Sequence, residues 1–407
     1  MLSPSTPLRV AISVRLSGVE ASIIFMKQII FFLFSFLFVN TYSQDTTYAR
    51  QVIKKLTSKE LFGRGYVKDG VNKAASYISK ELKTIGLSKF GKSYSQIYEF
   101  PVNTFPGTMS VVLDGKTLIP GKHYLVYPSA ETIKGGFQLF KTDSVTYEAN
   151  DGKRPFHIKL KLRKKLTYTV ATQISDNAVI ELLKDSFPNE LKTIDIIFKN
   201  KFIPNFKCQN LCGFIKGTHQ PDSFIVFTAH YDHLGAMGKE AYFPGANDNA
   251  SGVSVLLNLA KYYKTHPSKY SVAFIFFSGE EAGLLGSKYY SEHPIFPLSN
   301  IKFLTNLDLL GTGDDGIMVV NATVFKEQFE KLNQINVEKN YLKQIKQRGK
   351  AANSDHYWFS EKGVPSFFIY TMGGITAYHD IYDIEKTLPL TKYLEVCKLL
   401  IEFNAKF

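Results

Sequence analysis

Apolar runs typical of buried strands alternate with helix-like stretches through the second half of the chain. The apolar runs are SFIVFTA (223–229), SVAFIFFSG (271–279), IKFLTNLDLLG (301–311) and VPSFFIYT (364–371), and the helix-like stretches between them are 251–266, 283–293 and 324–337. Strands that are apolar throughout are buried on both faces, as in a sheet that helices cover on both sides. The pattern therefore predicts an α/β fold, in which ligands bind beyond the carboxyl ends of the strands.

The first half of the chain has a helix and then a different pattern. Residues 72–87 place Ala75, Ile78, Leu82 and Ile85 on one helical face, and Gly86 suits the C-cap. From about residue 110 to 200, short β-like runs alternate with turns, which indicates an inserted β-rich subdomain.

One stretch of this subdomain, SDNAVIELLKDSF (175–187), is predicted to be a helix that begins at Ser175 or Asp176. These changes of pattern divide the chain after its leader into three parts. They are the N-terminal part of the main domain (45–109), the inserted subdomain (110–204) and the core of the main domain (205–407).

Residues 26–44, MKQIIFFLFSFLFVNTYSQ, have the pattern of a secretory signal peptide. Lys27 supplies the positive charge, and a short apolar region (29–39) precedes small and polar residues. This region is shorter than the about 20 residues of a membrane span. We expect cleavage near Ser43 or Gln44 and a secreted or periplasmic protein without stable membrane insertion; an uncleaved N-terminal anchor is the alternative. Residues 1–25 are expected to be a non-native extension upstream of a start at Met26.

The chain has 407 residues and a formal net charge of +13, which permits contact with nucleic acid or anionic surfaces without establishing it. Its densest basic run, 153–165, alternates apolar and basic residues, which favours a strand with one solvated face over a nucleic-acid patch. No motif of a nucleic-acid-binding module is present, so we expect no nucleic-acid partner. Cys208 and Cys212 would stand about 13 Å apart along a strand, too far for a disulfide, and are expected to be buried thiols.

Acidic residues and histidines gather where the apolar runs end. They are His230, Asp232 and His233 after the first run, Glu280 and Glu281 after the second, Asp308 in the third, His379 beyond the fourth, and Asp248 just before a helix-like stretch. Carboxylates that meet at one edge of a sheet repel one another, and a divalent cation would compensate them. Carboxylate oxygens with two imidazoles suit zinc, with manganese and cobalt as alternatives. The number of carboxylates suggests two metals, roughly 3.5–4 Å apart, that share one of them.

Five ordered motifs resemble peptidase family M28, whose members include secreted aminopeptidases with two co-catalytic zinc ions. The motifs are AHYDH (229–233), GANDNASG (245–252), SGEEAGLLGS (278–287), NLDLLG (306–311) and YHDIYD (378–383). The resemblance covers about residues 205–407 and extends to LTSKELFGRGY (56–66), but not clearly to the insertion. It implies a mixed, twisted β-sheet flanked by helices, of the phosphorylase/hydrolase-like kind, and two zinc ions per chain.

The resemblance also implies a role for each residue of the motifs. His230 and Asp308 would hold one zinc ion, Glu281 and His379 the other, and Asp248 would bridge the two. Glu280 would be the general base, and Asp232 would orient His230 through its other ring nitrogen.

Four further residues have two interpretations each. His233 is either a loop histidine or a substrate contact. Asp355 and His356 lie in SDHYWF (354–359), which resembles a family segment that lines the site, and they either pack that loop or face the substrate. Tyr378 either donates a hydrogen bond to an oxyanion or packs.

The implied activity is hydrolysis of N-terminal residues from peptides that have a free N-terminus. Three alternatives stay open. A glutaminyl cyclase-like acyltransferase of the same fold uses one zinc ion, whereas both sets of ligand positions are filled here. A carboxypeptidase or dipeptidase would need an arginine-lined pocket, which the sequence does not reveal. An inactive binding homologue would be expected to lack a ligand or the base, and none is missing.

Overall fold

The computed structural model describes residues 45–149, 157–187 and 190–407. The predicted signal peptide (26–44) and the upstream extension (1–25) lie outside these residues. No helix in the described part of the chain is long and apolar enough to cross a membrane.

The main domain is built on a mixed sheet with eight strands among the described residues. In spatial order they are β1 (Ser95–Thr104), β11 (Lys201–Ile215), β15 (Tyr270–Phe277), β12 (Gln220–His230), β16 (Ile301–Leu307), β19 (Ser366–Thr371), β17 (Ile317–Val320) and β18 (Ile345–Gln347). The four central strands β15, β12, β16 and β19 are parallel to one another. By contrast, β11 pairs antiparallel with both β1 and β15, and β17 pairs antiparallel with β19 and parallel with β18. The predicted strands of the second half are thus confirmed, and their carboxyl ends share one edge.

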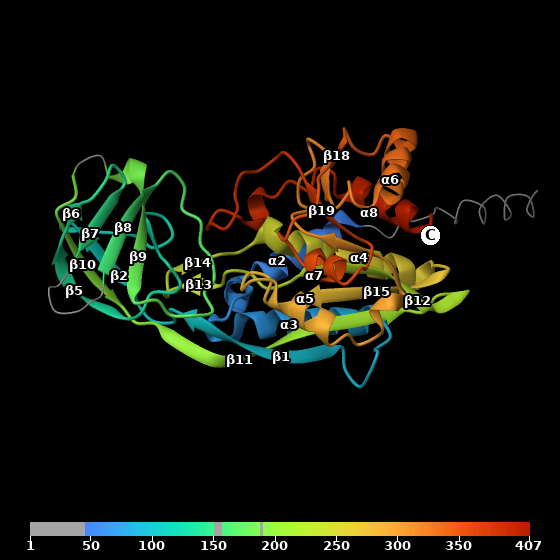
Figure 1. Cartoon of the computed structure of the whole chain (residues 1–407), viewed down its shortest axis with the longest axis horizontal. Helices are drawn as coiled ribbons and strands as arrows, with labels where there is room; N and C mark the ends of the chain where they lie inside the picture. The colour runs from blue at the N-terminus through green and yellow to red at the C-terminus, as the bar shows by residue number, and fades with distance from the viewer. Residues whose placement is uncertain (1–44, 150–156, 188–189) are drawn as a thin grey trace, which may run out of the picture. The chain divides into compact units, whose positions relative to one another are not determined.

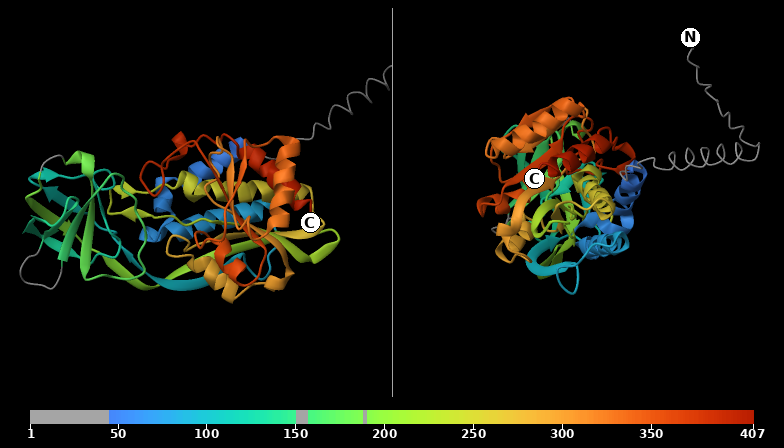
Figure 2. Two further views of the ribbon diagram at one scale, coloured as in Figure 1. Left: turned by 45° about the horizontal axis from the view of Figure 1, so that its top comes forward. Right: turned by 90° about the vertical axis from the view of Figure 1, so that its right-hand side faces the viewer.

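Helices cover both faces of this sheet (Figure 2). One layer contains α2 (Thr46–Leu56), α3 (Gly70–Ile85), α4 (Gly252–Thr265), α6 (Lys326–Lys339) and α8 (Tyr393–Asn404), and the other contains α5 (Leu285–Glu292) and α7 (His356–Glu361). Successive residues of β12 pack against opposite helical layers. Phe227 packs in the core under α4, and Val226 packs in the core that includes Tyr290 of α5. The predicted α/β fold is confirmed, and so is the helix that ends at Gly86, which has a φ of 83°.

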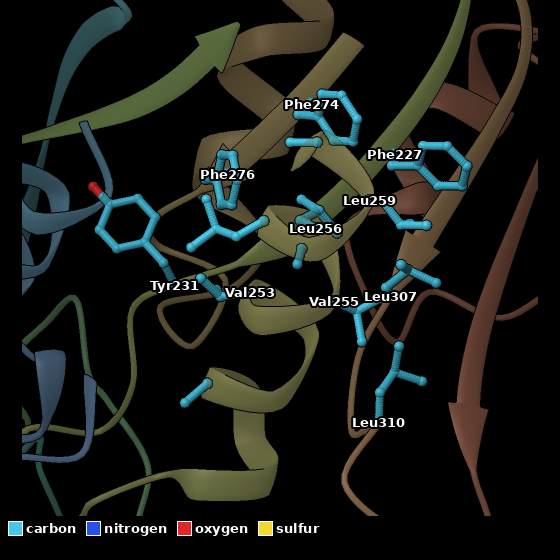
Figure 3. Packing of buried hydrophobic residues seen from close by; sticks show 14 of the residues in the cluster. Phe227, Tyr231, Val253, Val255, Leu256, Leu259, Phe274, Phe276, Leu307 and Leu310 are labelled. Carbon is cyan, nitrogen blue, oxygen red and sulfur yellow. The ribbon is translucent and has the colours of Figure 1, made fainter. Parts of the chain in front are cut away.

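The core beneath the carboxyl edge is tightly filled. Figure 3 shows Phe227 and Tyr231 packing near Phe274 and Phe276 of β15 and against Val253 and Leu256 of α4, and all six are at most 1% exposed. Fully burying a side chain of this size contributes roughly 1.5–3 kcal/mol. The strand ends that carry the acidic residues are therefore anchored on the face that α4 covers.

The inserted segment forms two sheets within its described residues. The first has the order β3 (Lys116–Thr117), β2 (Ser110–Leu113), β10 (Thr193–Phe198) and β5 (Ile133–Gln138), and the second β4 (Tyr124–Val126), β9 (Asn177–Leu183), β8 (His157–Arg163), β7 (Thr146–Ala149) and β6 (Phe140–Lys141). They enclose a core of their own, onto which the hairpin of β13 (Ala236–Met237) and β14 (Ala241–Tyr242) also packs. The long strands β1 and β11 run side by side and lead the chain into and out of these sheets (Figure 1).

Short 3₁₀ turns complete the chain. They are η1 (Lys59–Arg64), η2 (Val67–Asp69), η3 (Lys184–Ser186), η5 (Leu298–Asn300) and η6 (Glu385–Thr387), and one further helical turn, η4 (Ala246–Ser251), leads into α4.

The helix predicted at 175–187 is wrong. Residues 177–183 form β9 instead, which pairs with both β4 and β8. Ala178, Ile180 and Leu182 are completely buried. The buried apolar residues thus recur at every second position, which is the period of a strand. The apolar residues of this stretch also fit a helical period, but pairing with a strand on each side stabilises the extended conformation instead.

The solvated face predicted for the basic run is confirmed for its described part, β8. Ile158 and Leu160 are buried, whereas Lys159 pairs with Glu148 at 3.2 Å on the partly exposed face. Cys208 and Cys212 are buried and free, as expected, and so is Cys397.

Candidate metal centre and active site

The parallel strands bring the predicted donor residues to one place. His230 is the last residue of β12, Asp308 follows β16 directly, and Glu280 and Glu281 lie in the turn after β15. Asp248 lies in the turn η4 that leads into α4, and His379 lies in the loop after β19. Among the described residues, two sets of these side chains lie close enough together to hold a metal ion: His230, Glu280 and Asp308, and His230, Asp248 and Glu281.

Asp248 stands between two groups of donor atoms. Its Oδ1 is 3.2 Å from His230 Nε2, which is 3.4 Å from Asp308 Oδ1. Its Oδ2 is 3.1 Å from His379 Nε2, which is 3.3 Å from Glu281 Oε2. Ligand atoms at about 2.0–2.1 Å from a tetrahedral zinc ion lie about 3.3 Å apart, so each of these four distances matches the distance between neighbouring ligands of a zinc ion. Asp248, with one oxygen in each group, has the geometry of a bridging ligand.

The electrostatics of the cluster also favour cations. Burial raises the pKa of Glu280 well above its usual range, and the nearby Glu281, Asp355 and Asp308 raise it further. Burial likewise raises the pKa of Asp308, whose Oδ1 is buried without a hydrogen-bond partner. Burial lowers the pKa of His379, but Glu281 and Asp248 outweigh it and raise that pKa to about 9. Without metal, the ionised forms of these buried carboxyl groups are therefore destabilised, and bound divalent cations would stabilise them. The carboxylate and imidazole donors present fit zinc.

Asp232 contacts the other ring nitrogen of His230 mainly through its backbone. His230 Nδ1 donates a hydrogen bond to the carbonyl oxygen of Asp232 at 3.2 Å, whereas the Asp232 carboxylate lies 3.7 Å away. The carboxylate accepts hydrogen bonds from the Tyr66 hydroxyl and from the backbone N–H groups of Glu280 and Glu281. Its side chain thus positions the turn that carries both glutamates, and its backbone orients His230.

His233, Asp355 and His356 are completely buried and do not line the cavity beside the cluster. His233 Nδ1 lies 2.6 Å from Glu281 Oε1, whereas His379 pairs with Oε2 of the same carboxylate. Burial raises the pKa of Asp355 to about 7 and lowers that of His356 to about 4. Because these three side chains are buried, they cannot contact a substrate in this conformation. Of the four residues with two interpretations, Tyr378 is the accessible one: it is 44% exposed and stacks on His379.

A cavity of about 260 Å³ opens beside the donor atoms. Besides the six donor residues, it is lined by Leu309, Arg348, Asn353, Phe368, Tyr370 and Tyr378. A larger cavity of about 460 Å³ lies around Phe62 and Tyr242, but Glu240 is its only lining residue that could bind a metal. The smaller cavity is therefore the candidate active site.

Three functional residues were missed from the sequence. Arg64 is completely buried and donates five hydrogen bonds to backbone carbonyl oxygens, two of which belong to Gly245 and Asp248. The Asp383 carboxylate accepts the backbone N–H groups of Asn247 and Asp248. Arg348 supplies a positive charge to the cavity. Arg64 and Asp383 lie in motifs that carry the family resemblance, so the resemblance could have pointed to them. No motif in the sequence points to Arg348.

Comparison with known proteins finds similar peptidases. The model of peptidase family M28 matches residues 210–403. Over 118 residues the chain is 41% identical to the aminopeptidase YwaD of Bacillus subtilis, a match that covers 28% of this chain and 24% of that protein. The matched stretch is thus about a quarter of that relative's length.

Two solved structures share the fold. A zinc aminopeptidase from Bacillus subtilis, BSAP, superposes with a TM-score of 0.65 at 20% identity over 89% of this chain and 94% of that one. A glutaminyl cyclase from Bacteroides thetaiotaomicron superposes with a TM-score of 0.52 at 14% identity over 89% and 98%. At these identities the likeness shows the fold, and the choice between activities depends on the side chains of the site.

Proposed function

Since residues 210–403 match the model of peptidase family M28, we propose that the chain belongs to this family and is a zinc-dependent aminopeptidase that releases N-terminal residues from peptides. The observation that carries the proposal is the pair of donor groups that share Asp248. The predicted signal peptide at 26–44 would place the enzyme in the periplasm or outside the cell, which N-terminal sequencing of the exported protein tests.

His230 and Asp308 would hold one zinc ion, His379 and Glu281 the other, and Asp248 both. Zinc bound there would polarise the scissile carbonyl and lower the pKa of water. The proton transfers are carried out by a side chain of the protein. Glu280 borders the same cavity, and its turn is held by the Asp232 carboxylate. It accepts a proton from the attacking water and returns it to the leaving amine.

The prediction that tests the metal assignment is a stoichiometry of two zinc ions per chain. Two groups with one shared carboxylate exceed what a single tetrahedral site needs. Elemental analysis of dialysed, active protein is expected to give two zinc ions, and Asp248→Asn is expected to weaken both, because each of its oxygens serves one group. A stoichiometry of one in active protein would instead favour a mononuclear enzyme such as a cyclase.

A second candidate is a dipeptidase, and Arg348 is the observation that favours it. The Arg348 side chain lines the cavity and is exposed, and no carboxylate pairs with it in the described part of the chain. A guanidinium beside a small cavity could bind the C-terminal carboxylate of a dipeptide through charge-assisted hydrogen bonds.

Substrates with blocked ends separate the two activities. The aminopeptidase is expected to cleave aminoacyl amides and free dipeptides and to leave N-acetylated peptides intact. Arg348→Met is expected to raise KM for free dipeptides by roughly tenfold, if one charge-assisted hydrogen bond is lost, and to leave aminoacyl amides unaffected. Failure to cleave any amide that lacks a C-terminal carboxylate would favour the dipeptidase.

A further inference from the structure

The loop that carries His379 is held by the inserted β-rich subdomain. The backbone N–H of Tyr168 donates to the carbonyl oxygen of His379 at 2.8 Å, and His379 Nδ1 lies 3.1 Å from the carbonyl oxygen of Tyr168. A carbonyl oxygen can only accept, so Nδ1 carries a hydrogen, and in the neutral ring that binds a metal Nε2 keeps its lone pair. It is Nε2 that faces Asp248 and Glu281. The subdomain thus selects the tautomer of His379 that can bind a metal.

Contacts on both flanks of His379 reinforce this arrangement. Lys165 Nζ lies 3.1 Å from Asp380 Oδ2 and donates to the carbonyl oxygen of Thr376 at 2.8 Å. On the far side, Ile381 packs against the core of the subdomain. The loop is therefore tied to the subdomain before, at and after the histidine.

Tyr168 is itself fixed in place. Its ring is buried and stacks on Phe243, with ring centroids 4.6 Å apart and an angle of 9° between the ring planes. Phe243 belongs to the main domain and follows β14. The backbone of Tyr168 is thus seated between the two parts of the chain.

The conformation of His379 needs such support. Its φ is 54°, in the left-handed region that residues other than glycine seldom adopt. Conformations of this kind persist where the surroundings determine them, and they are frequent at functional sites.

We infer that residues 165–168 are a clamp that makes the inserted subdomain part of the metal centre, because the clamp sets the position and tautomer of His379. The inference rests on the proposed two-zinc function. It makes Tyr168 and Lys165 positioning residues, which act through His379 and touch neither metal nor substrate.

The test compares zinc affinities in four full-length variants. Lys165→Met removes the ties to Thr376 and Asp380, and Tyr168→Ala removes the ring that seats the clamp. Tyr168→Phe keeps the ring. Lys159→Met removes a lysine of the same subdomain that pairs with the partly exposed Glu148. Competition with a chromophoric chelator gives the affinity of each zinc ion, and thermal unfolding of metal-free protein reports stability.

Lys165→Met and Tyr168→Ala are expected to weaken one of the two zinc ions by about 10–100-fold, the usual effect of losing a group that orients a metal ligand, and to leave the other nearly unchanged. The two controls are expected to bind both ions as the wild type does. Lys165 is half exposed, so its variant should fold even if Tyr168→Ala does not. Wild-type affinity at both sites in Lys165→Met, or equal weakening at both sites with a lower Tm, would overturn the clamp. A wild-type protein that binds a single zinc ion would overturn the two-zinc function and the clamp with it.

Discussion

Replacing Glu280 by glutamine is expected to lower kcat by on the order of 10²–10⁴-fold, the range that general acid–base catalysis contributes. Glutamine keeps the shape of the side chain but cannot accept the proton from water. Both zinc ions should stay bound, because neither of the donor groups around Asp248 uses Glu280. KM should change less than kcat, since the proton transfer belongs to the transition state.

The matched control is Glu281→Gln, which changes the neighbouring residue in the same way. Glu281 Oε2 lies 3.3 Å from His379 Nε2 and Oε1 lies 2.6 Å from His233 Nδ1, so both of its oxygens are engaged. This variant is expected to lose zinc affinity first and activity as a consequence. Metal content and kcat must be measured on the same preparations.

Two results would contradict this division of roles. Glu280 is close enough to His230 and Asp308 to share a metal with them. Loss of zinc from Glu280→Gln, with retention in Glu281→Gln, would exchange the two roles. Near-full activity of Glu280→Gln would remove it from proton transfer altogether.

Replacing Arg64 by methionine is expected to lower the free energy of unfolding by about 3–5 kcal/mol, because several buried carbonyl groups would lose their donor at a cost of roughly 1–3 kcal/mol each. Its guanidinium donates to the carbonyl oxygens of Leu56, Tyr231, Pro244, Gly245 and Asp248. Burial lowers the pKa of Arg64 to about 10, but Asp248, Asp383 and Asp232 favour its charged form. Methionine fills much of the volume but leaves these buried carbonyl groups without donors.

Urea unfolding of metal-free protein measures this effect apart from zinc binding. Arg50→Met is the matched control: Arg50 is 41% exposed, pairs with Glu385 at 3.3 Å and also donates to two carbonyl oxygens. Its loss should cost about 1 kcal/mol or less. If Arg64→Met unfolds at the same urea concentration as the control, the buried network does not hold the Asp248 turn.

The sequence was informative wherever one short stretch contained the whole signal. The apolar runs predicted β12, β15, β16 and β19 because a strand covered on both faces must be apolar throughout. The donor residues were predictable because each follows or ends one of these strands or precedes α4, and parallel strands end at one edge.

Residues 175–187 show where local pattern misleads. The stretch suits a helix or a strand, and the choice was made by β4 and β8, which pair with it from both sides. The residues of the stretch itself do not indicate that β4 and β8 will pair with it.

By itself, then, the sequence determined the α/β layout and the order of donor residues along the chain, since both follow from hydrophobic periodicity and strand ends. Only the tertiary structure decided which oxygen of Asp248 faces which histidine, that Arg64 lies beneath the turn, and that Tyr168 holds His379 from 211 positions away. The physical reason is that these contacts join distant segments whose approach depends on the packing of the whole domain. No short window of sequence contains both partners.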